Sequence, residues 1–190
     1  MQDVFVLEKT SSVNQKDSYI LSYPYMIAFF EGKEVIKALD LVCGAHMVYG
    51  WMPTILELYT DKGNLNLDQA ARLLTGVKRG MDIADSELEE LSKLINNSLV
   101  GASKLLHFVS PGNFPIWDSK VFTFVFNTRP HNYRVNKIEN YRKYIEVLNN
   151  LQEDPRFESL HNSMNQKIGY NVSPLRALEL VMYLNAPVAS

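Results

Sequence analysis

Apolar residues recur at three- and four-residue spacing along most of this chain, and that spacing constrains the fold more than any other feature. In residues 33–49 it places a wide apolar stripe along one side of an amphipathic helix. The same spacing returns in residues 66–79, 86–97, 103–109, 118–126, 137–151, 154–164 and 173–184. No two segments indicate a pair of strands, so the sequence predicts an all-α fold, a compact bundle of eight or nine helices.

The amino-terminal residues leave alternatives open. Residues 1–16 are expected to form a polar leader or arm, and residues 17–190 a single helical domain. The apolar patch at residues 4–7 could be a short strand or an arm that packs elsewhere. A helix is expected to restart at Pro53 and run to residue 59, because proline is well tolerated in a first helical turn. Cys43 is expected to be a small buried group on the 33–49 helix.

Composition excludes several classes of protein. With 46% hydrophobic and 21% charged residues, the 190-residue chain can bury one substantial core. Its single cysteine excludes an internal disulfide and a multi-cysteine zinc site, and its four histidines lack a metal-binding spacing, so no metal or other cofactor is expected. No apolar run reaches the roughly 18 residues of a membrane span and no secretory signal is evident, so we expect a cytoplasmic protein without a membrane partner.

Residues 98–121, SLVGASKLLHFVSPGNFPIWDSKV, are the stretch that suggests chemistry. A helix over 86–97, a turn at 98–102 and a helix over 103–109 have the plan of a helix-hairpin-helix. A loop rich in glycine and proline follows, and Asp118 opens the next helix. This order resembles the helix-hairpin-helix DNA glycosylase superfamily. The family hairpin reads close to L-P-G-V-G-x-K-T-A and its aspartate segment close to V-D-T-H-V, where this chain has SLVGASKLL and WDSKV.

The resemblance implies roles for individual residues. Asp118 matches the family aspartate, which positions the scissile nucleotide and stabilises positive charge on the sugar. Lys104 falls where bifunctional members carry the lysine that attacks the sugar carbon and forms a Schiff base. The hairpin around Gly101 and Ser103 would hold a DNA phosphate through backbone N–H groups. The hairpin has one glycine where the family has two, and segment 104–118 is about one helical turn shorter than in the family.

Basic side chains gather just after this stretch. Between residues 120 and 143 they are Lys120, Arg129, Arg134, Lys137, Arg142 and Lys143, opposed only by Glu139. Histidine and tyrosine are interleaved with them, as is typical of a surface that faces DNA. Trp117 could add a platform on which a base stacks. The net charge of −2 gives no such indication for the chain as a whole.

Each of these residues also has an ordinary structural interpretation. Asp118 could serve only as the N-cap of the helix that follows it. Lys104 could be a solvated surface lysine, and Trp117 a core anchor. Lys120 and the other basic residues up to 143 could be solvated charges on a helix and a loop.

Three further residues are expected to be structural. His107, on an apolar helix, is typical of a half-buried histidine whose hydrogen bonds are satisfied. Arg176 and Glu179 lie one turn apart on the last helix, where they could pair with each other or reach a neighbouring element.

The leading prediction is a DNA glycosylase-like protein that extrudes a damaged or modified base into a pocket and cleaves its N-glycosidic bond, with or without a lyase step. DNA is then the partner. The alternative is a non-catalytic module on the same scaffold that binds nucleic acid or a protein, the latter through the acidic segment 82–90 and the aromatic amino-terminal third. The deciding geometry is whether Lys104 and Asp118 converge on one cleft.

Overall fold

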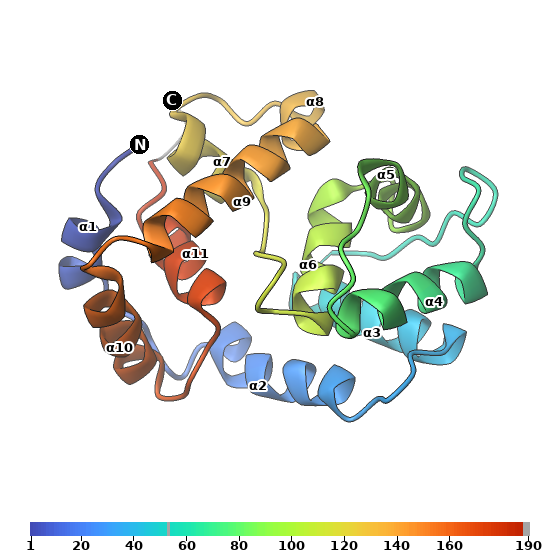
Figure 1. Ribbon diagram of the computed structural model, residues 1–190, viewed down its shortest axis with the longest axis horizontal. Coiled ribbons are helices and arrows are strands. Elements are labelled where there is room, and N and C mark those ends of the chain that lie inside the picture. Colours follow the sequence, from blue (N-terminus) through green and yellow to red (C-terminus); the bar gives the residue numbers. More distant parts are fainter. Residues whose placement is uncertain (53, 188–190) are drawn as a thin grey trace.

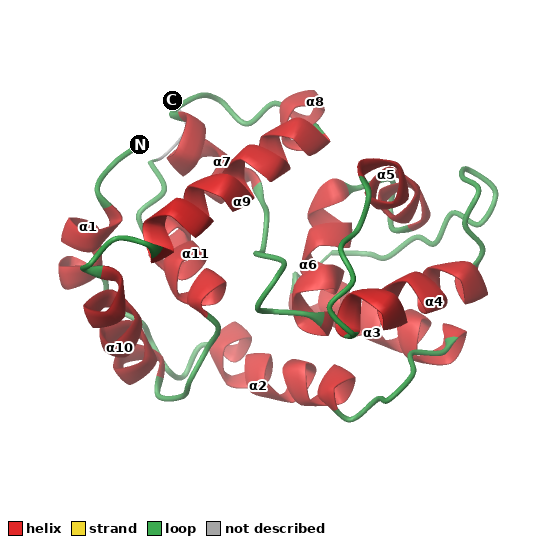
Figure 2. Ribbon diagram, in the orientation of Figure 1, coloured by secondary structure: helices red, strands yellow, loops and turns green. Residues whose placement is uncertain are grey.

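The computed structural model describes residues 1–52 and 54–187. Its helices are α1 (Val4–Thr10), α2 (Ser18–Glu31), α3 (Ala38–Trp51), α4 (Leu67–Lys78), α5 (Asp85–Leu94), α6 (Leu99–Val109), α7 (Ser119–Phe126), α8 (Asn132–Val135), α9 (Ile138–Gln152), α10 (Phe157–Ile168) and α11 (Pro174–Leu184) (Figure 1). Apart from one isolated bridge between Leu58 and Ile95, these two ranges contain no β-structure (Figure 2). The predicted all-α class is confirmed, with eleven helices in the described ranges rather than eight or nine.

The first helix, α1, contains the apolar patch at residues 4–7, for which the sequence allowed either a short strand or an arm. The Asp3 carboxylate caps it by accepting a hydrogen bond from the Phe5 N–H at 2.9 Å. Val4 and Phe5 are buried, and the helix packs against α10 and α11. The apolar patch is therefore helical, and it ties the amino terminus to the last two helices.

Residues 54–59 form no helix, so the helix predicted there is wrong; its predicted start, Pro53, lies outside the described residues. The segment is held by the turn between α5 and α6, where the Asn96 N–H donates to the Glu57 carbonyl at 3.0 Å. These partners are far apart in the sequence. Local apolar spacing carries no information about such a contact, which explains the error.

The side of helix α3 that faces the core differs from the side that the apolar spacing predicts. Leu41 and Val48 are fully buried, whereas Cys43 is exposed, so the prediction of a buried cysteine is wrong. A side chain at Gly44 would overlap the Phe30 ring of α2. Close packing of α2 on α3 therefore turns the glycine side of α3 inward.

The helices form two groups. Helices α2 to α6 pack on one another in the first group, and α1 and α7 to α11 make up the second, with α8 packed on α9. Segment 110–118 joins α6 to α7 and runs between the groups, in yellow-green down the middle of Figure 1. One continuous set of buried apolar residues extends through both groups. In the two described ranges, no helix has the length and apolar character needed to cross a membrane.

Candidate active site

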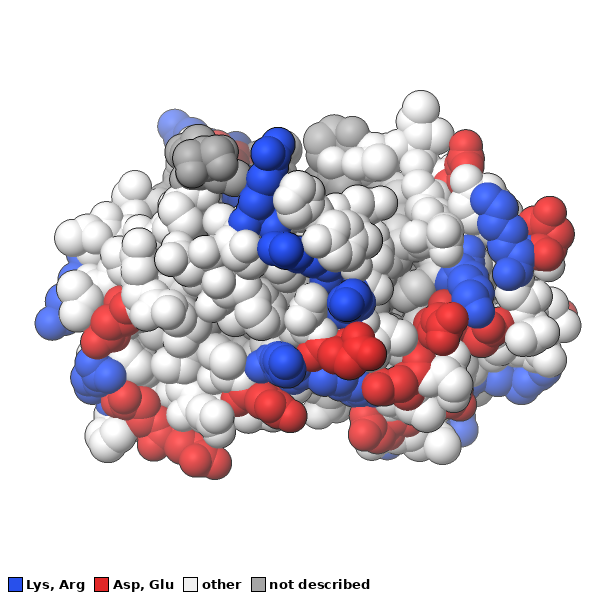
Figure 3. All heavy atoms as spheres, turned by 90° about the horizontal axis from the view of Figure 1, so that it is seen from above, with Lys and Arg blue, Asp and Glu red and all other residues white. Residues whose placement is uncertain are grey.

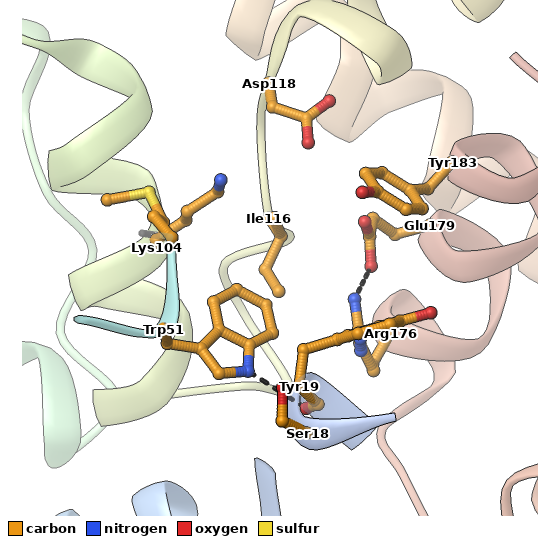
Figure 4. A pocket seen from close by; sticks show the side chains of 10 residues that line it. Ser18, Tyr19, Trp51, Lys104, Ile116, Asp118, Arg176, Glu179 and Tyr183 are labelled. Atoms are coloured by element: carbon orange, nitrogen blue, oxygen red, sulfur yellow. Dashed lines mark hydrogen bonds and ion pairs between the residues drawn. The ribbon is translucent and has the colours of Figure 1, made fainter. Parts of the chain in front are cut away.

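A cleft of about 390 Å³ lies between the two groups of helices (Figure 4). It is lined by Ser18, Tyr19, Trp51, Met52, Lys104, Ile116, Asp118, Arg176, Glu179 and Tyr183. An outer groove of about 440 Å³ adjoins it and shares Met52, Lys104, Asp118 and Tyr183 with it. The fold therefore brings Lys104 and Asp118 to one cleft, as the glycosylase hypothesis requires.

Lys104 lies on α6 with only 8% of its surface exposed. Its ammonium group faces the cleft and lies 5.9 Å from the centre of the Trp51 ring (Figure 4). Among the described residues, none forms an ion pair or hydrogen bond with this group. Burial lowers the pKa of Lys104, and the carboxylates of Asp118 and Glu179 offset that shift only in part. The sequence interpretation of a solvated surface lysine is therefore wrong.

Asp118 is the N-cap of α7, where its carboxylate accepts a hydrogen bond from the Val121 N–H at 2.9 Å. Asp118 is thus a helix cap, but capping is not its only contact in the structure. The same carboxylate lines the cleft, between Lys104 on one side and Tyr183 on the other (Figure 4). An ionised carboxylate has about four acceptor positions, so capping leaves it able to interact with a ligand.

The loop that carries Asp118 is held by buried side chains from both groups of helices. His107 Nδ1 donates to the Phe114 carbonyl at 2.7 Å, and the Tyr141 hydroxyl donates to the Pro115 carbonyl at 3.0 Å. His107 is fully buried, rather than half-buried as predicted, and burial lowers its pKa to about 3. It is therefore a neutral histidine that fixes the loop. Because the loop is anchored, Asp118 is held in place before any ligand arrives.

The hairpin residues expected to meet DNA lie inside the protein. The Gly101 N–H donates to the Ser98 side chain at 3.2 Å, and a Cβ at Gly101 would overlap the Tyr49 hydroxyl. Ser103 is fully buried and donates to the Val100 carbonyl at 2.9 Å. This glycine serves close packing of α6 on α3, and its N–H is already engaged, so neither residue is placed to hold a phosphate.

Trp117 is also buried and does not offer a platform for a base. Its indole N–H donates to the Val135 carbonyl at 2.8 Å, and its ring packs against Phe122 and Tyr144. The core-anchor interpretation of Trp117 agrees with this placement. Trp51, which the sequence did not single out, is the tryptophan that lines the cleft.

The basic residues after Asp118 divide by position. Lys120 lines the outer groove, with its ammonium 4.2 Å from the centre of the Tyr183 ring, and Arg129 is exposed next to a groove residue, Pro130. Lys143 is exposed on α9 but lines neither cavity. Figure 3 shows the molecule from above, with Lys and Arg side chains in blue in the middle of the view and Asp and Glu side chains in red below them. Part of the predicted basic surface therefore lies along the rim of the groove.

Two arginines of the same segment are engaged within the protein. Arg142 pairs with Asp85 at 2.9 Å and also donates to the Ile83 carbonyl, which fastens α9 to the start of α5. Arg134 donates to the Thr128 hydroxyl at 3.0 Å. Arg142 is thus a structural residue, and its predicted contact with DNA is not supported by this placement.

Arg176 and Glu179 form the ion pair that their spacing suggested, but they also line the cleft. The side chains are 4% and 1% exposed, and Figure 4 shows the pair beside the cavity. Burial raises the pKa of Glu179 to about 7, against the opposing effect of Arg176. Sequence reasoning treated the pair as structural only. The sequence did contain a signal that these two residues are unusual, because they are charged whereas the rest of their helix is apolar on all sides.

In residues 1–52 and 54–187, no three histidine, cysteine, aspartate or glutamate side chains are grouped as a metal ion would require. Comparison with protein-family models, with curated proteins and with solved structures finds no match to this chain.

Proposed function

We propose that this protein is a DNA glycosylase with lyase activity that acts on a damaged or modified base. One observation carries the proposal. A buried amine on α6, with no ion-pair partner among the described residues, and a carboxylate at the start of α7 face the same cavity. The resemblance of segment 98–121 to helix-hairpin-helix glycosylases points to the same two residues, Lys104 and Asp118.

Lys104 supplies the nucleophile. Its lowered pKa increases the fraction of neutral amine near pH 7, and a neutral amine has the lone pair that attack requires. The amine nitrogen bonds to C1′ of the nucleotide as the bond from C1′ to the base breaks. The base leaves with the electron pair and takes up a proton. The sugar ring then opens as O4′ takes up a proton, which gives a Schiff base. Loss of a proton from C2′ expels the 3′ phosphate, and water finally hydrolyses the Schiff base and restores the amine.

Asp118 stabilises the charge that develops on the sugar. As the base leaves, C1′ acquires positive character, and a fixed carboxylate in a poorly hydrated cleft lowers the energy of that state. The anchored loop supports this role because the carboxylate needs no reorganisation when the substrate binds.

The walls of the cleft suit an extruded base. Trp51, Tyr19 and Tyr183 line it, and aromatic rings stack on any nucleobase. Its volume of about 390 Å³ falls within the range of pockets that hold small organic groups. Lys120, in the outer groove, is placed for a backbone phosphate near the extruded nucleotide.

Borohydride trapping tests the proposal. An abasic DNA duplex with sodium borohydride should yield a covalent adduct with the wild-type protein and none with Lys104→Met. A panel of duplexes, each with one oxidised, alkylated or deaminated base, then identifies the substrate. On that substrate, Asp118→Asn should release the base about 10³-fold more slowly, since asparagine keeps the N-cap but removes the charge.

Normal base release by Asp118→Asn would overturn the catalytic assignment. A non-catalytic binding module would behave differently in both assays. It would bind DNA in a salt-dependent way, would keep that binding after either substitution, and would form no adduct.

A further inference from the structure

Glu179 is a buried carboxyl group that has no role in the chemistry of Lys104 and Asp118. Its side chain is only 1% exposed, yet it lines the cleft that contains those two residues. Burial of a carboxylate is costly, and Arg176 is its only ion-pair partner among the described residues. A carboxyl group kept at the wall of a cavity is therefore a candidate for chemistry inside that cavity.

Glu179 lies further into the protein than the two residues that would meet the sugar. Lys104 and Asp118 line both the cleft and the outer groove, where the DNA backbone would lie. Glu179 and Arg176 line the cleft but not the outer groove, and so do two of the aromatic rings that would stack on the base. A nucleotide that enters from the outer groove with its sugar at Lys104 therefore carries its base toward Glu179.

The two oxygens of the Glu179 carboxyl group have different surroundings. Oε2 accepts a hydrogen bond from Arg176 Nη1, and Figure 4 shows the other oxygen turned away from that arginine. In the part of the chain that the structure describes, Oε1 has no hydrogen-bond partner. A proton on Oε1 can therefore pass to a ligand, while Arg176 stabilises the carboxylate that remains.

The surroundings of Glu179 keep a substantial fraction of it protonated near neutral pH. Burial raises its pKa to about 7 and Asp118 also raises it, whereas Arg176 and Lys104 act in the opposite direction. Burial likewise shifts Lys104 toward its neutral form. The cleft thus combines a protonated acid with a neutral amine, the two states that acid-assisted nucleophilic attack requires. The charged and titratable side chains around Glu179 are Arg176, Asp118, Lys104, Tyr19, Tyr23 and Tyr144.

We infer that Glu179 donates a proton to the departing base, and that the substrate of the cleft is a neutral base, such as an oxidised or deaminated one. The inference rests on the proposed function of the cleft. The proton passes from Oε1 to a ring nitrogen or carbonyl oxygen of the base, as the bond from C1′ breaks and the base takes its electron pair. The base departs uncharged, and Glu179 remains as a carboxylate paired with Arg176 until water returns the proton. A purine alkylated on N7 or N3 already carries a positive charge and needs no such proton.

Release of neutral and cationic bases tests the inference. The probes are duplexes with one uracil, hypoxanthine, 8-oxoguanine or thymine glycol, which are neutral, or with one 7-methylguanine, which is cationic. Wild-type protein should release at least one neutral base, and faster than 7-methylguanine. Glu179→Gln should slow that release by about 10²–10³-fold, because glutamine still accepts from Arg176 but has no acidic proton.

Glu146→Gln is the matched control. Glu146 is exposed on α9 and lines neither the cleft nor the outer groove. The substitution is chemically the same, so this variant should release the neutral base at the wild-type rate.

Two further measurements separate proton donation from a structural role. For the wild-type protein, kcat/KM on the neutral base should fall as the pH rises above about 7, because Glu179 loses its proton. The fall should be absent in Glu179→Gln. An abasic duplex has no base to protonate, so Glu179→Gln should still form the borohydride adduct with Lys104.

The inference is overturned if Glu179→Gln releases the neutral base at the wild-type rate or keeps the fall in kcat/KM above pH 7. It is also overturned if wild-type protein releases none of the four neutral bases, or releases 7-methylguanine faster than all of them. Loss of the adduct together with base release in Glu179→Gln would make Glu179 a structural residue. The proposed function fails separately: wild-type protein that releases a neutral base but forms no adduct uses Glu179 as the acid without Lys104 as the nucleophile.

Discussion

Two buried cations line the same cleft from opposite sides, and their surroundings differ. Arg176, on α11, is 3% exposed and pairs with Glu179 one turn further along the helix. Lys104, on α6, is 8% exposed and has no ion-pair partner among the described residues. Burial of a charge is costly unless a partner offsets the loss of water. The paired cation is thus kept charged, whereas the other is shifted toward its neutral, nucleophilic form.

Lys104→Met gives the largest effect that this contrast predicts. Adduct formation and strand cleavage should fall on the order of 10⁴-fold or more, because the nucleophile is removed. Stability should stay the same or rise, because the substitution also removes the cost of burying a charge without a partner. Borohydride trapping and urea denaturation measure the two effects. A large loss of stability would show that Lys104 is a structural residue.

Arg176→Met should lower the stability of the protein, in contrast to Lys104→Met. It leaves Glu179 buried without its partner, which typically costs about 3–5 kcal/mol of unfolding free energy. The double variant Arg176→Met/Glu179→Leu should recover most of that loss, since two apolar side chains replace the pair. Urea denaturation of Arg176→Met, Glu179→Leu and the double variant completes the cycle. A loss below about 1 kcal/mol in the single variant would contradict the view that pairing holds Arg176 in the core.

The difference between the two cations also predicts how stability depends on pH. Between the lowered pKa of folded Lys104 and the ordinary lysine value of 10.5, the unfolded chain binds a proton that the folded chain does not. Stability should therefore rise with pH through this window, and the rise should be missing in Lys104→Met. Unfolding free energies of both proteins at a series of pH values from 7 to 10 measure it. Parallel curves would mean that folded Lys104 titrates normally.

Most of the helices could be predicted from the sequence, because their local signals agree. Asp118 caps a helix where the pattern placed it, and its side chain accepts from the Val121 N–H. The turn predicted at 98–102 is wrong, because α6 already begins at Leu99, with Ser98 as its N-cap. Segment 54–59 could not be predicted, since its conformation depends on Asn96. The buried side of α3 was predicted wrongly for the same kind of reason, because packing on another helix decided it.

The sequence singled out Lys104 and Asp118, but it did not indicate which residues surround them or which neighbours are buried. The pattern around residues 98–121 identified Lys104 and Asp118, and the structure places both at one cleft. Burial of Ser103 and Trp117 depends on which helices surround them, and the spacing of their neighbours does not contain that information. The same holds for Arg142, whose ion pair with Asp85 joins helices distant in the sequence.

The smallest predicted effect concerns two cations at the protein surface, of which one is paired and the other is not. Arg142 is engaged by Asp85, whereas Lys120 lies in the outer groove against the Tyr183 ring. Only a cation available to phosphate releases counterions when DNA binds. Lys120→Gln should therefore reduce the slope of log affinity against log salt concentration by about 1, and Arg142→Gln should leave it unchanged.

Fluorescence anisotropy with one labelled duplex at several salt concentrations measures both slopes. Arg142→Gln should instead cost up to about 1 kcal/mol of stability, as expected for a partly exposed ion pair that fastens α9 to α5. Equal slopes for the two variants would mean that the rim of the groove does not meet the DNA backbone. A reduced slope for Arg142→Gln alone would place DNA on the face formed by α5 and α9, away from the cleft.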